Sequence, residues 1–169
     1  TNYDDEYFDR ESPRTYIMPD TVVQIGEGDP GDPQLNRAQM DFILNQVAQN
    51  LQSLGYQRLS EIDAQELPDV AVTVSTLIVK VTEVGCIPWY DWWGWYPWYP
   101  GWGWGGSYCY PAYAYSYETG TLVIDMINPE GSTSEEFDRV WHAGINGLIR
   151  SSVNGNQEFV SRTIDKAFA

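Results

Sequence analysis

A stretch rich in aromatic residues, Gly85 to Tyr117, limits what the rest of this chain can fold into. It holds seven of the eight tryptophans, eight of the twelve tyrosines and one charged residue, Asp91. Six glycines and four prolines interrupt it, so neither a helical nor a strand periodicity persists along it. We therefore expect residues 85–117 to form a long aromatic loop between regular elements.

The length of 169 residues is typical of one domain with a substantial core. We interpret residues 1–13, which are polar and acidic, as a lead-in segment and residues 14–169 as a single domain. No run approaches the 18 consecutive apolar residues of a transmembrane helix. The opening residues, Thr1-Asn-Tyr-Asp-Asp-Glu, are also unlike a signal peptide.

The charge balance excludes one class of partner. Twenty-four acidic and nine basic residues give a net charge of −15, and the acidic residues are spread along the chain. Such a field repels phosphate backbones and anionic lipid surfaces. Proteins that bind single-stranded nucleic acid combine aromatic side chains with a basic groove. We therefore expect no nucleic-acid partner.

Two cysteines, Cys86 and Cys109, bracket the tryptophan-rich part of the loop. We expect a disulfide across its base, which would contribute about 3 kcal/mol in the chain-entropy model. Such a bond persists only in an oxidising compartment. The alternative is a pair of free thiols.

The first half of the chain predicts a strand, a helix and a second strand. Residues 14–25 have a strand pattern that is broken at Pro19-Asp20, which indicates an edge strand or a bend. Asp32 and Pro33 then favour a helix start, and apolar residues recur every three or four positions up to Leu54, before Gly55. Residues 70–84 form the strongest strand signal, and a phase change near Ser75-Thr76 predicts either a bulge or burial of both faces.

The second half predicts a hairpin and a final helix. Residues 121–128 and 137–144 read as its two strands, the second with a possible extension through Ile149. Residues 157–168 carry the apolar spacing of a helix. Together the elements favour an α+β fold: a two-layer sandwich with a mostly antiparallel sheet, two helices on one face and a long aromatic hairpin loop.

No arrangement of residues indicates catalysis, a cofactor or a metal. His142 is the only histidine, and no nucleophile motif, phosphate loop or zinc motif accompanies it. Asp125 lies within an apolar strand, where its side chain faces the core, alternates outward together with Thr121, or meets a basic partner such as Arg139 across the hairpin. The segment Gly28 to Asp32 could supply oxygen ligands to calcium, but helix capping explains Asp32 without a metal. We expect a protein that is not an enzyme.

Several short segments resemble the family called domain of unknown function 4136. They are Leu54-Gly-Tyr-Gln, Leu67-Pro-Asp-Val-Ala-Val, Gly120-Thr-Leu-Val-Ile-Asp-Met, Val140-Trp-His-Ala-Gly and Lys166-Ala-Phe, and the resemblance spans residues 10–169. An insertion rich in tryptophan, tyrosine and glycine before the Gly-Thr-Leu strand is also typical of that family. The resemblance implies a bacterial envelope lipoprotein, anchored to the outer membrane by an acylated cysteine upstream of Thr1. It implies no known activity.

The aromatic loop is the candidate binding site. Seven tryptophans carry about 1,400 Å² of mostly apolar surface, more than the roughly 300–600 Å² of the largest patch on a typical monomer. The loop either packs on itself as a small core or contacts an envelope protein, a glycan or the membrane interface. The candidate residues are Trp89, Trp92, Trp93, Trp95, Tyr96, Trp98, Tyr99, Trp102 and Trp104. We expect an envelope protein partner, with carbohydrate binding as the alternative.

Overall fold

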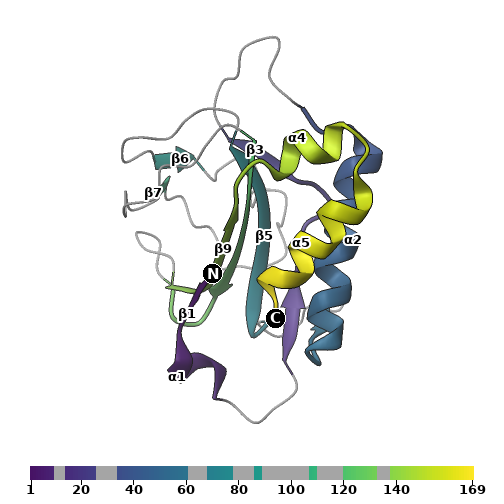
Figure 1. Ribbon diagram of the computed structural model, residues 1–169. Helices are drawn as coiled ribbons and strands as arrows, with labels where there is room; N and C mark the ends of the chain where they lie inside the picture. The colour runs from purple at the N-terminus through teal and green to yellow at the C-terminus, as the bar shows by residue number, and fades with distance from the viewer. Residues whose placement is uncertain are drawn as a thin grey trace.

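Three long antiparallel strands form the centre of the sheet in the computed structural model (Figure 1). They are β5 (Val70–Leu77), β8 (Thr121–Asn128) and β9 (Asp138–Ile145). The structure describes residues 1–9, 14–25, 34–60, 68–77, 86–88, 107–109, 120–132 and 138–169. The predicted hairpin of β8 with β9 is confirmed. The strands before and after the aromatic loop, β5 and β8, also pair, as a hairpin connection requires.

Shorter strands extend the sheet on both sides in the order β1-β9-β8-β5-β2-β4, and β3 also pairs with β5. β1 (Asn2–Tyr3) is antiparallel to β9, whereas β2 (Thr15–Ile17), β3 (Val23–Ile25) and β4 (Gln57–Arg58) form only parallel pairs. The sheet is mostly antiparallel, as predicted, but the parallel pairing at this edge was not expected. The physical reason is that the helix between β3 and β4 acts as a crossover, which returns the chain in its original direction.

The bend predicted at Pro19-Asp20 is confirmed, because the strand signal of residues 14–25 is divided between β2 and β3. β2 pairs with the start of β5 and β3 with its end. Every residue of β5 is buried. The change in the apolar alternation near Ser75-Thr76 is therefore explained by burial of both faces in the described part of the strand, and not by a bulge.

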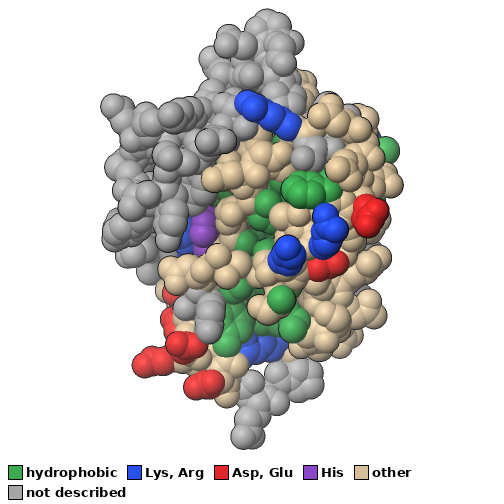
Figure 2. Space-filling view, in the orientation of Figure 1, with side chains coloured by type: hydrophobic (Ala, Val, Ile, Leu, Met, Phe, Trp, Pro, Cys, Tyr) green, Lys and Arg blue, Asp and Glu red, His purple; other side chains and the backbone are tan. Residues whose placement is uncertain are grey.

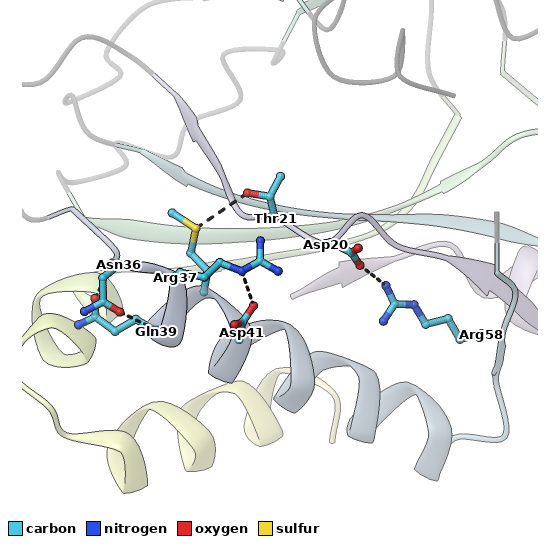
Figure 3. A network of polar contacts seen from close by, with 8 residues as sticks. Asp20, Thr21, Asn36, Arg37, Gln39, Asp41 and Arg58 are labelled. Atoms are coloured by element: carbon cyan, nitrogen blue, oxygen red, sulfur yellow. Dashed lines mark hydrogen bonds and ion pairs between the residues drawn. The ribbon is translucent and has the colours of Figure 1, made fainter. Parts of the chain in front are cut away.

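Helix α2 (Arg37–Ser53) begins later than predicted. Asn36 is its N-cap: its side chain accepts a hydrogen bond from the Gln39 N–H at 3.0 Å, and the Gln39 side chain accepts one from the Asn36 N–H at 2.7 Å (Figure 3). This reciprocal capping box satisfies two backbone N–H donors, and it explains why the helix begins after Asn36. The expected start, Asp32-Pro33, lies outside the described residues. The predicted end is confirmed, with Leu54 as C-cap and Gly55 at φ 88°.

The C-terminal part contains two helices, α4 (Leu148–Val153) and α5 (Gln157–Ala167). α5 matches the predicted final helix. The proposed extension of strand 137–144 through Ile149 is wrong, because β9 ends at Ile145 and Gly147, at φ 73°, turns the chain into α4. Apolar Leu148 and Ile149 suit a buried helix as well as a strand, so a short apolar run did not distinguish the two.

The main core lies between the sheet and the helices α2 and α5. Alternate residues of β5 and β8 join buried residues of both helices in one cluster, which includes Val70, Val72, Val74, Leu122, Ile124, Met126, Ile43, Leu44, Val47, Leu51, Val160 and Ile164. Figure 1 shows both helices on the same side of the sheet. We call this sheet surface the helix face and the other one the opposite face.

The first nine residues, expected as a lead-in, contribute to the core. β1 pairs with β9, and the short helix α1 (Asp5–Phe8) follows, capped by Asp4. Tyr7 is buried, and its hydroxyl donates to the Asp69 carbonyl. The guanidinium of Arg14 lies 5.3 Å from the Tyr7 ring centre and 4.8 Å from that of Phe8. These contacts hold the N-terminal segment against the end of the sheet.

Candidate functional site

Two short strands, β6 (Cys86–Pro88) and β7 (Ser107–Cys109), form a separate antiparallel ladder. They flank residues 89–106, which hold all nine candidate aromatic residues from Trp89 to Trp104 and lie outside the described residues. The ladder brings the two ends of this aromatic segment together. Figure 1 shows β6 and β7 on the side of the sheet away from α2 and α5.

The register of this ladder places Cys86 directly opposite Cys109. Residues that face each other in an antiparallel pair have Cα atoms about 4.5–5.5 Å apart. A disulfide typically spans Cα distances of about 4.4–6.8 Å. The backbone is therefore compatible with the predicted disulfide.

A buried polar cluster lies at the middle of the opposite face. Asp125 of β8 is 1% exposed, and its Oδ1 is 2.6 Å from Nδ1 of His142 on β9. Nη1 of Arg139, also on β9, is 3.7 Å from the same oxygen. Asp125 thus shares one carboxylate oxygen between two basic side chains.

The second oxygen of Asp125, Oδ2, is buried and has no hydrogen-bond partner among the residues that the structure describes. A buried acceptor without a partner costs about 1–3 kcal/mol. The nearby guanidinium of Arg139 offsets part of the cost of burying this carboxylate. His142 reaches the surface, where its ring is the purple side chain in Figure 2.

The sequence predicted part of this cluster. The expected contact of Asp125 with Arg139 across the hairpin is confirmed. The sequence does not predict the contact of Asp125 with His142, and the expected outward position of Asp125 is wrong, because its side chain is buried. Their pairing depends on a register shift between Met126 and Ile127, which places His142 rather than Trp141 opposite Asp125.

Comparison with known proteins places the chain in a family. The family profile of the domain of unknown function DUF4136 matches residues 1–169. The chain belongs to the DUF4136 family. A search of curated proteins finds no match.

The fold of this DUF4136 chain is also similar to a crystal structure of a DUF4136 family protein from Bacteroides thetaiotaomicron VPI-5482. The two chains are 23% identical, and the TM-score is 0.53 over 97% of this chain and 94% of the other. At that identity the similarity concerns the fold.

The chemistry available to the polar cluster of this DUF4136 domain is limited. A carboxylate that contacts Nδ1 of a histidine fixes the orientation of its ring, an arrangement used in catalytic and metal sites. Within the described residues, no group of three or more His, Cys, Asp or Glu side chains could hold a metal ion. The described helices also include none that is long and apolar enough to cross a membrane.

A second polar cluster supports the N-terminal segment instead of forming a site. Nη1 of Arg14 donates to the Tyr56 hydroxyl at 3.1 Å. Burial raises the pKa of Tyr56 above its ordinary value of 10.0, and the Arg14 hydrogen bond partly opposes that rise. Burial likewise raises the pKa of Tyr16, against a smaller effect of Arg58. Both tyrosines are thus neutral near pH 7.

Proposed function

We propose that this DUF4136 domain is a non-enzymatic component of the bacterial cell envelope, in which the aromatic segment 89–106 binds an envelope protein. The observation that carries the proposal is the β6–β7 ladder, which closes the base of a segment containing seven of the eight tryptophans. Tryptophan and tyrosine are common anchors of protein interfaces because they bury a large area at a small cost in conformational entropy.

We also propose a finer architecture and compartment. In this proposal, residues 85–117 form a hairpin loop of a two-layer sandwich, and a Cys86–Cys109 disulfide closes the loop in an oxidising compartment. A lipid anchor upstream of Thr1 holds the domain at the outer membrane, facing the periplasm or the cell surface. The facing register of the two cysteines supports the disulfide. Titration of thiols in the denatured, unreduced protein tests it, and two free thiols would exclude it.

Affinity capture from solubilised envelopes tests the partner. We expect the intact domain to retain a defined envelope protein, and a variant without residues 89–106 to lose it. In this variant Asn-Gly replaces the deleted residues as a two-residue hairpin turn between Pro88 and Ser107, so that β6 and β7 can still pair. Its urea unfolding shows whether the sheet still folds. Leu54→Ala serves as a control, because Leu54 is an exposed apolar residue at the end of α2. Figure 1 shows α2 on the other side of the sheet from β6 and β7. Retention of the same protein by the deletion variant would contradict the proposal.

Carbohydrate binding is the alternative, because flat aromatic faces stack on sugar rings and the segment contains a single charged residue, Asp91. Retention on an insoluble envelope glycan that is lost on alanine substitution of Trp92, Trp93 and Trp95 would favour this alternative over the protein partner. Turnover of a cell-wall substrate by the deletion variant would contradict both proposals.

A further inference from the structure

The chain contains two Asn-Gly steps, Asn146-Gly147 and Asn154-Gly155. An asparagine followed by glycine is chemically vulnerable, because no side chain shields the glycine nitrogen from the asparagine side-chain carbonyl. Glycine also gives the backbone the freedom that this attack requires. From the sequence alone, the two steps are equivalent.

The structure makes the two asparagines different. Both are exposed, so solvent access does not distinguish them. Asn146 follows the last residue of β9, and its Oδ1 accepts a hydrogen bond from the Thr121 hydroxyl at 2.7 Å. Thr121 is completely buried in β8. The side chain of Asn146 is therefore tied to the sheet.

Asn154 lies in the turn between α4 and α5, and its side chain has no hydrogen bond to any described residue. The following glycines do not distinguish the two steps, because Gly147 and Gly155 have similar φ values of 73° and 76° and a Cβ built on either would have nothing within 4 Å. The difference between the two steps is therefore the hydrogen bond that holds the Asn146 side chain, which has no counterpart at Asn154 among the described residues.

We infer that Asn154 is a site of spontaneous deamidation and that Asn146 is protected from it. The deprotonated backbone nitrogen of Gly155 attacks Cγ of Asn154, an N–Cγ bond forms, and the Cγ–Nδ2 bond breaks. Ammonia leaves and carries the displaced proton. Water then opens the cyclic imide at either carbonyl, which leaves aspartate or isoaspartate at position 154.

The product changes the start of α5. The new carboxylate stands two residues before Asn156, the N-cap, whose side chain accepts from the Phe159 N–H at 3.3 Å. A negative charge near a helix N-terminus is favourable. Isoaspartate instead lengthens the backbone by one bond ahead of the cap, so the two products affect α5 differently.

Peptide mapping by mass spectrometry tests the inference on the whole folded chain, incubated in mildly alkaline buffer. We expect the peptide with Asn154 to gain the mass of an amide-to-acid conversion severalfold faster than the peptide with Asn146. In the urea-unfolded chain the two rates should become similar, because local sequence alone then governs them. Equal rates in the folded chain, faster conversion of Asn146, or no conversion of Asn154 would overturn the inference.

Two variants separate the causes. Thr121→Val removes the hydroxyl that holds Asn146 with little change in shape, and it should accelerate conversion at Asn146 without altering Asn154. Asn154→Gln should remove the reactive site and leave Asn146 unchanged. If Thr121→Val fails to fold, the comparison of folded and unfolded wild-type chain still decides the matter.

Discussion

The two faces of the sheet are buried to a similar extent but by different chemistry. The helix face presents Val72, Ile124 and other aliphatic residues to α2 and α5. The opposite face presents the polar residues Thr73, Ser75 and Asp125, which are 1–2% exposed, beside a smaller apolar cluster of Ile17, Ala71 and Ile127. Figure 2 shows that acidic side chains otherwise gather at the surface, for example over α1. The contrast shows that burial alone does not identify the hydrophobic core of this domain.

Stability therefore has a different origin on each face. On the helix face it comes from removing apolar surface from water and from close packing. On the opposite face, where a smaller apolar cluster is also buried, stability depends in addition on the partners of a buried carboxylate, because an unpaired buried charge is costly. Three predictions test this contrast.

The largest effect is expected from Ile124→Ala on the helix face. Ile124 is completely buried, and its truncation leaves a cavity that costs about 2–5 kcal/mol in the free energy of unfolding. Urea denaturation measures the loss. Leu54→Ala is the control, since Leu54 is 55% exposed, and it should change the free energy by less than about 0.5 kcal/mol. Equal effects would mean that the assigned core is wrong.

His142→Ala on the opposite face should cost about 1–3 kcal/mol, because Oδ1 of the buried Asp125 loses its closest donor. A double-mutant cycle with Asp125→Ala isolates the pair. Once the carboxylate is absent, His142→Ala should have a much smaller effect. Additive losses in the cycle would show that the two side chains do not stabilise each other.

The smallest effect is a difference between two reciprocal substitutions on neighbouring residues of β5. Val72→Thr places a hydroxyl among aliphatic side chains, whereas Thr73→Val removes one from a face where Asp125 is the cross-strand neighbour. We expect Val72→Thr to be the more destabilising by about 1 kcal/mol. The midpoints of urea unfolding measure both. If Thr73→Val proved more destabilising than Val72→Thr, the proposed difference between the two faces would be contradicted.

Local sequence patterns predicted most of the helices and strands that form the two faces of the sheet and cover one of them. The three-and-four spacing of apolar residues predicted α2 and α5, and apolar strand patterns predicted β5 and β8. The same patterns failed where competing local signals were of similar strength. Asn36 with Gln39 outweighed Asp32-Pro33 as a helix start, and the apolar run after Ile145 formed α4 instead of more strand.

The two candidate sites also differ in how far the sequence predicts them. The aromatic segment is visible in composition alone, because seven tryptophans stand in one stretch. Its binding residues stay a prediction. The polar cluster could not be derived in full, because the expected hairpin fixed which strands pair but not their register. One extra residue at the shift after Met126 decides which β9 side chain faces Asp125.

The sequence by itself determined the main helices α2 and α5, the strands β5 and β8, the excess of negative charge and the place of the aromatic segment, since these follow from composition and short-range periodicity. Tertiary structure decided the parallel edge of the sheet, the pairing of Asp125 with His142 and the different surroundings of two identical Asn-Gly steps. These depend on contacts between residues far apart in the chain. Such contacts are set by how the elements pack together, which no local pattern contains.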